Sequence, residues 1–192
     1  MNVQKTPIPI FVYIDGQNLF KSLGENNLEP DYPKILEYLQ TKYKAQKVFI
    51  FLRHTFFQKD FFNYLRSLGF IVKTTLPQVE YKDLTTGKSK TKSNVDGDLI
   101  ITAVVEYVEK QNHNMILISG DGDFLPLVLF YENRDKLVQI IAINKSKTSK
   151  FLQRKSKRQG LKPRNITYIE ESLLHLTKKV LPISREPGDL ER

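Results

Sequence analysis

The chain contains no cysteine, which excludes disulfide bonds and zinc sites built from thiolates. This absence fits a reducing compartment, so we expect a cytoplasmic protein. No stretch approaches the run of about 18 apolar residues that a membrane-spanning helix needs, so no membrane partner is expected. The first ten residues, MNVQKTPIPI, lack a long apolar run after a basic start, so no signal peptide is expected.

Several familiar catalytic patterns are also missing. The chain has no GxSxG, P-loop or GxGxxG sequence. Its three histidines lie far apart and lack metal-ligand spacing, which favours structural or surface roles for His54, His113 and His175. A haloacid-type phosphatase needs two aspartates after the first strand, where this chain has only Asp15. Lys145 follows a late predicted strand, as in receiver-type phosphoacceptor domains, but those domains also need paired acids after the first strand.

The residues that are present indicate one folded, basic domain. The length of 192 residues, the apolar fraction of 40%, 12 phenylalanines and 9 tyrosines are sufficient for a core. The net charge is +9, and residues 144–164 carry nine basic and no acidic side chains. A localised basic patch attracts polyanions, which favours nucleic acid as the partner; a solvated helix face is the alternative. These basic residues are Lys145, Lys147, Lys150, Arg154, Lys155, Lys157, Arg158, Lys162 and Arg164.

Short apolar runs alternate with amphipathic segments, which predicts a three-layer α/β/α sandwich with a mainly parallel central sheet. Strands are expected at residues 8–14, 47–52, 70–73, 115–118, 137–143 and 165–169. Helices are expected at residues 17–24, 31–43, 56–68, 95–110, 124–134, 146–158 and 170–179. Residues 74–94 are polar and interrupt this alternation, which predicts a hairpin or mobile loop projecting from the sheet edge. We expect one domain over residues 1–180 and a disordered tail over residues 181–192.

The most informative stretch is MILISGDGDF, residues 115–124. Its first four residues indicate a strand buried on both faces, and the two glycines after them allow a sharp turn. Asp121 and Asp123 therefore follow the end of this strand, just as Asp15 follows the end of the strand expected at residues 8–14. In open α/β sheets, ligands bind at this edge. The acidic residues expected near it are Asp15, Asp96, Asp98, Asp121 and Asp123.

These carboxylates indicate a metal site. If the strands at residues 8–14 and 115–118 are parallel neighbours, their carboxyl ends lie about 5 Å apart. Converging carboxylates repel one another, and Mg²⁺ or Mn²⁺ relieves that repulsion through oxygen ligands. Such ions hydrolyse phosphodiesters, often as a pair about 4 Å apart. Asn18, one turn beyond Asp15, could hold a phosphate oxygen, a water or the metal. The alternative is that each aspartate is only a turn former or helix cap.

Three segments resemble a known family. YIDGQNLF (13–20), NVDGDL (94–99) and ISGDGDFLPLV (118–128) resemble, in order and spacing, the signature blocks of NYN-domain proteins, the LabA-like branch of the PIN-like nuclease superfamily. The resemblance covers residues 8–143 and implies a PIN-like Rossmannoid fold with metal-dependent RNA cleavage. It also implies site residues by position: metal-binding and catalytic Asp15, Asp96, Asp121 and Asp123, with Asn18 as their polar companion and Ser119 as a supporting hydroxyl.

One position departs from the family pattern. Many members carry a further aspartate six residues after the one that matches Asp96, and this chain has Thr102 there. Asp98 is the nearest acidic substitute and would act as a supporting residue. However, it lies about 200° around the helix from Asp96 and is expected to face away from it. The departure implies weaker metal affinity or activity.

The sequence therefore predicts a Mg²⁺- or Mn²⁺-dependent endoribonuclease that acts on single-stranded or structured RNA. A non-catalytic RNA-binding or regulatory module is the alternative, and DNA is a minor third substrate. Arg53 and His54 could contact a phosphate, and the phenylalanine pairs at 56–57 and 61–62 could stack on bases, although their spacing favours the core. Backbone contacts are expected from Lys82, Lys88, Lys90, Lys92, Lys145, Lys147, Lys150, Arg154, Lys155, Lys157 and Arg158.

Overall fold

The computed structural model describes residues 7–53, 59–75, 79–82, 89–92, 94–110, 112–154 and 164–180. Six strands form one sheet in the order β4-β3-β1-β7-β8-β9, and all neighbouring pairs are parallel. The predicted α/β/α fold is therefore confirmed. The strands are β1 (Ile10–Asp15), β3 (Ala45–Arg53), β4 (Ile71–Thr75), β7 (Asn114–Ile118), β8 (Leu137–Ala142) and β9 (Ile166–Tyr168).

The direction of the strand order changes next to β1. From β1 the chain builds outward through β3 to β4, then crosses to the other side of β1 and continues through β7, β8 and β9. Asp15 pairs with Phe51 of β3, and Ile14 pairs with Ile118 of β7. The carboxyl ends of β1 and β7 are therefore side by side at the topological switch point, where open α/β sheets bind ligands.

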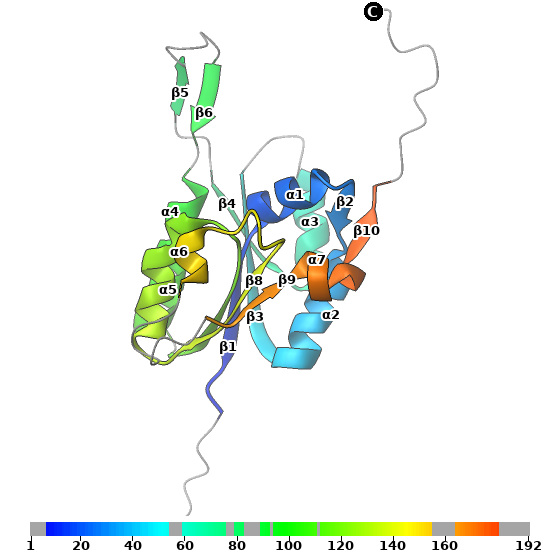
Figure 1. Cartoon of the computed structure of the whole chain (residues 1–192). Coiled ribbons are helices and arrows are strands. Elements are labelled where there is room, and N and C mark those ends of the chain that lie inside the picture. The colour runs from blue at the N-terminus through cyan, green and yellow to red at the C-terminus, as the bar shows by residue number, and fades with distance from the viewer. Residues whose placement is uncertain are drawn as a thin grey trace, which may run out of the picture.

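Helices cover both faces of the sheet (Figure 1). Val12 and Ile14 of β1 belong to one apolar cluster, and Phe11 and Tyr13 belong to the other, so β1 is buried on both faces. This double burial explains why β1 and β7 appear in the sequence as continuous apolar runs. The first cluster packs under α1 (Gly16–Gly24), α2 (Tyr32–Tyr43), α3 (Lys59–Leu68) and α7 (Ile169–Ser172); the second packs under α4 (Val95–Val105), α5 (Leu125–Glu132) and α6 (Lys150–Gln153).

Two antiparallel pairs lie outside the main sheet. The strands β5 (Val79–Lys82) and β6 (Ser89–Lys92) form the predicted hairpin, which Figure 1 shows beyond the N-terminal end of α4. The second pair joins β2 (Leu28–Pro30) to β10 (Thr177–Lys179). The prediction of a helix over residues 170–179 was therefore wrong beyond α7. A 3₁₀ turn (Leu174–Leu176) follows α7, and the chain then extends because β2 offers it a strand edge.

The basic segment differs most from the prediction. Instead of a helix over residues 146–158, the structure has the short α6, and the chain is extended at Arg154 (ψ 148°). The reason is Arg164, whose guanidinium donates to the backbone carbonyls of three residues at the end of this helix, Phe151, Leu152 and Arg154. Arg164 also makes a two-pronged ion pair with Glu132, at 3.0 and 3.1 Å, and both side chains are buried. Arg164 is therefore part of the interior.

Local sequence signals specify several other elements correctly. Asp31 caps α2 by accepting from the backbone N–H of Lys34 at 3.3 Å, and Gly69 ends α3 with a φ of +112°. His113 is buried, and its Nε2 is hydrogen-bonded to the hydroxyls of Tyr13 and Tyr131, which confirms a structural role.

Two of the predicted helices differ in detail from the expectation. The helix expected over residues 95–110 ends as α4 at Val105 and continues as a π-helical turn (Glu106–Lys110), which leaves Val108 67% exposed. In α3 the fully buried phenylalanine is Phe62, whereas Phe61 is only partly buried. Among the described residues, no helix is both long enough and apolar enough to cross a bilayer.

Candidate functional site

Asp15 occupies the centre of the candidate site. It ends β1 and caps α1 directly, because its Oδ1 accepts a hydrogen bond from the backbone N–H of Asn18 at 3.0 Å. A Cβ at Gly16 would lie 2.9 Å from the carbonyl oxygen of Phe51 on β3, so only glycine lets the helix begin this close to the sheet. This local geometry holds the Asp15 carboxylate at the switch point with only 4% exposure.

Ser119 connects the ends of the two central strands. Its hydroxyl donates to Oδ2 of Asp15 at 3.2 Å and accepts from the backbone N–H of Asp121 at 3.1 Å. Ser119 is itself buried. The structure thus places the Ser119 hydroxyl against Asp15. The family resemblance implied Ser119 as a supporting hydroxyl of the site.

The acidic turn after β7 is held by its own side chains. Oδ1 of Asp121 accepts from the backbone N–H of Asp123 at 3.0 Å, which caps a 3₁₀ turn (Gly122–Phe124). The side-chain oxygen of Asn18 accepts from the backbone N–H of Gly120 at 3.5 Å. Asn18 therefore links the first turn of α1 to this acidic turn, and the orientation leaves its amide nitrogen as a donor.

The carboxylates interact through their charges. Burial raises the pKa of Asp15 to about 6, against the hydrogen bonds from Asn18 and Ser119, and the charges of Asp96 and Asp121 raise this pKa further. Asp96, in the first turn of α4, also has a raised pKa because of burial and the charges of Asp121 and Asp123. Four of the predicted residues therefore share one electrostatic environment at the carboxyl edge of the sheet.

This environment has the donor atoms that a hard divalent cation prefers, which are carboxylate oxygens with an amide nearby. The repulsion that raises two of the pKa values is the kind that such a cation relieves. Within the described parts of the chain, however, no three acidic or histidine side chains are close enough together to surround one ion. The types of donor atom therefore fit Mg²⁺ or Mn²⁺. The carboxylates of the described residues have an open arrangement, which means that they lie too far apart to surround one ion.

Asp98 does not join this group of carboxylates. Its Oδ2 accepts a hydrogen bond from the hydroxyl of Thr75, at the end of β4. The strand β4 is separated from β1 by β3, so Asp98 is directed away from the acidic turn, as the helical angle predicted. In this structure Asp98 supports the end of β4.

A groove of about 700 Å³ opens beside the acidic turn, between it and the segment after β8. Its lining combines acidic, amide and basic groups with one exposed aromatic ring, from Asn18, Asp121, Asp123, Lys147, Ser149 and Phe151. Ser149 and Phe151 were not predicted as site residues. They lie in the segment that was interpreted as a helix, and no motif distinguishes them. Ser149 reaches the site because its N–H donates to the carbonyl of Gly120 at 2.9 Å.

The predicted basic contacts are only partly described. Lys147 lines the groove and forms an ion pair with Glu25, and Lys145 and Lys150 are exposed nearby. The Arg154 guanidinium lies 4.8 Å from the centre of the Phe151 ring. The backbone of the hairpin carries Lys82, Lys90 and Lys92, whose side chains are not described. The positions outside the described residues are His54, the phenylalanine pair at 56–57, Lys88, Lys155, Lys157, Arg158, Lys162 and the expected tail at 181–192.

Comparison with known proteins gives three matches. The NYN domain pattern matches residues 9–159. The low amplitude and bright protein LabA of Synechococcus elongatus is 27% identical over 122 residues, which is 62% of this chain. The aligned region spans 64% of that protein's length. A crystal structure of a protein of unknown function from Vibrio parahaemolyticus superposes with a TM-score of 0.62 at 21% identity, covering 88% of this chain and 96% of the other, which shows a common fold.

Proposed function

Because the chain belongs to the NYN domain family, in the PIN-like nuclease superfamily, we propose that it is a divalent-metal-dependent endoribonuclease. The observation that carries the proposal is the burial of Asp15 at the switch point, under the charges of Asp96 and Asp121. These carboxylates repel one another in the metal-free protein, and a bound cation would relieve that repulsion.

In this proposal the residues that would hold Mg²⁺ or Mn²⁺ are Asp15, Asp96, Asp121 and Asp123. When bound, the ion supplies Lewis-acid activation of water and offsets negative charge on the phosphate. The protein's own groups bind and orient the RNA. The amide nitrogen of Asn18 donates to a phosphate oxygen, because its side-chain oxygen is already bonded to Gly120.

The remaining groups hold the site and the strand in position. Ser119 fixes the rotamer of Asp15 through its hydroxyl, and Asp123 is exposed at the rim of the groove, where it can reach a bound ion. Lys147 contributes positive charge to the groove wall. The exposed Lys145, Lys150 and Arg154 lie on the same segment and position the phosphate backbone without reading sequence.

A non-catalytic RNA-binding module is the second candidate. Thr102, where many family members have an aspartate, and the open arrangement of the carboxylates favour it. Such a module would bind RNA with salt-sensitive affinity and keep that affinity after the acids are neutralised.

The test is cleavage of an end-labelled single-stranded RNA with Mn²⁺, with Mg²⁺ or with EDTA, beside DNA of the same sequence. We expect RNA products with Mn²⁺ or Mg²⁺ and none with EDTA, because the cation would supply the activation of water that cleavage needs. Attack by water should leave 3′-hydroxyl ends, whereas a contaminating metal-independent ribonuclease would leave 3′-phosphates. RNA that is bound in every sample and never cut would establish the non-catalytic candidate instead.

A further inference from the structure

A second depression lies beside the acidic site, across the first turn of α1. It has a volume of about 430 Å³, which is in the range of small-molecule binding sites. Gln17 lines this pocket, whereas the next residue, Asn18, lines the acidic groove. The pocket also includes Leu52 and Arg53, at the end of β3, the strand next to β1. The two depressions therefore share one helical turn directly after Asp15.

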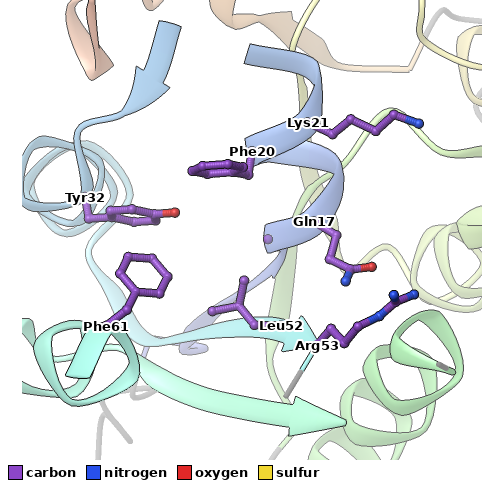
Figure 2. Close-up of a pocket in the computed structure, with 8 residues that line it drawn as sticks. Gln17, Phe20, Lys21, Tyr32, Leu52, Arg53 and Phe61 are labelled. Atoms are coloured by element: carbon purple, nitrogen blue, oxygen red, sulfur yellow. The ribbon is translucent and has the colours of Figure 1, made fainter. Parts of the chain in front are cut away.

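Aromatic rings form one part of this pocket. Figure 2 shows Phe20, Tyr32 and Phe61 around a hollow, with Leu52 below Phe20 in that view. The rings of Tyr32 and Phe61 meet edge to face at 5.6 Å and 65°, so these two support each other. Phe20, in contrast, is 55% exposed on α1, although it is a large apolar side chain. Phe20 thus leaves much of its ring open to a ligand.

Polar groups form the other part. In Figure 2 the side chains of Gln17 and Arg53 lie together at the end of the pocket away from Tyr32. An amide can bond to the edge of a base as donor and acceptor, and the cations Arg53 and Lys21 favour a polyanion nearby. Aromatic faces combined with hydrogen-bonding groups are the means by which proteins hold unstacked RNA bases. An apolar peptide would use the rings but not the hydrogen-bonding groups of the Gln17 amide.

We infer that this pocket is a nucleobase subsite, which takes an unstacked base of single-stranded RNA next to the phosphate at the acidic site, with Phe20 as the stacking residue. The inference rests on the proposed function, since it assigns the same RNA to both depressions. It restricts the substrate class to RNA that is single-stranded at this position, because a base held in a duplex cannot enter the pocket.

The absence of tryptophan from the chain allows a direct test. In Phe20→Trp the new indole is the only one, and a base stacked on it quenches its fluorescence. We expect quenching by a 12-nucleotide single-stranded RNA in EDTA, where cutting is prevented, and no quenching by the same RNA with abasic sugars. Ile101→Trp is the matched control, because Ile101 is 63% exposed on α4, outside the pocket, and should not respond.

Affinity measurements separate stacking from general apolar contact. Phe20→Leu should weaken binding of the intact RNA roughly tenfold, whereas Phe20→Tyr should keep wild-type affinity because it keeps the ring. RNA binding with no quenching in Phe20→Trp, or equal affinity of Phe20→Leu and wild type, would overturn the subsite and leave the proposed function standing. Equal quenching by abasic RNA would also overturn it. No RNA binding by wild type would overturn both.

Discussion

Replacing Asp121 with asparagine is expected to lower metal-dependent RNA cleavage roughly 10³-fold or more, with the fold intact. Asp121 caps the N–H of Asp123 through Oδ1, and the amide oxygen of asparagine can accept the same bond. The substitution therefore keeps the turn and removes the charge. That charge is one of those that raise the pKa values of Asp15 and Asp96, so its loss leaves fewer carboxylates to hold a cation.

The measurement is single-turnover cleavage of labelled RNA with Mn²⁺, with circular dichroism and thermal unfolding as checks on the fold. Asp60→Asn is the matched control, because Asp60 is an exposed aspartate in the first turn of α3 and lines neither the acidic groove nor the pocket beside it. It should cleave at the wild-type rate. A folded Asp121→Asn protein with wild-type activity would remove Asp121 from the mechanism.

Replacing Asp15 with asparagine is expected to abolish cleavage and to stabilise the metal-free protein near neutral pH. The pKa of Asp15 in the folded chain is about 6, above its ordinary value of 3.8, so the folded state binds this proton more tightly than the unfolded state. The contribution of Asp15 to the free energy of unfolding therefore falls as pH rises from about 4 through about 6, by about 3 kcal/mol. Asparagine carries no charge at any of these pH values, so Asp15→Asn should not show this fall in the free energy of unfolding.

Urea unfolding in EDTA at pH 4.5 and pH 7.5 measures the effect. Wild type and Asp60→Asn should lose stability between these pH values relative to Asp15→Asn, and Mn²⁺ at pH 7.5 should restore stability to these two proteins but not to Asp15→Asn. The same pH dependence in wild type and Asp15→Asn would mean that the Asp15 carboxylate carries no unfavourable charge. The account of the site would then fail at its central residue.

Most of the fold and the main acidic positions were accessible from the sequence for a physical reason. A strand buried on both faces must be apolar at every position, so β1 and β7 appear as continuous runs. The polar residues that directly follow each run, Asp15 at the end of β1 and the turn at 119–123 after β7, then mark the carboxyl edge of the sheet. This argument located Asp15 and Asp121 without coordinates, because the chain has only a few ways to continue after a buried strand.

Other features depend on contacts between distant residues that no local pattern records. The strand β10 forms because β2, far away in the chain, has an open edge. Arg164 was counted in the basic patch, but its pairing with Glu132 places it in the interior and shapes the end of α6. Ser149 reaches the acidic groove through one backbone hydrogen bond to Gly120. Composition and spacing predict none of these contacts, because each depends on the tertiary structure.

The most direct test of the central claim is the location of bound Mn²⁺ by nuclear magnetic resonance. At 22.4 kDa the chain is suitable for amide spectra, and a paramagnetic ion broadens the signals of nearby amides even when it binds weakly. We predict that small amounts of Mn²⁺ first broaden the amides of Asp15, Asn18 and residues 119–123, that Mg²⁺ in excess reverses this, and that Asp121→Asn weakens it. Broadening centred on another acidic surface, such as that of Glu29 and Asp31, or unchanged in Asp121→Asn, would contradict the account.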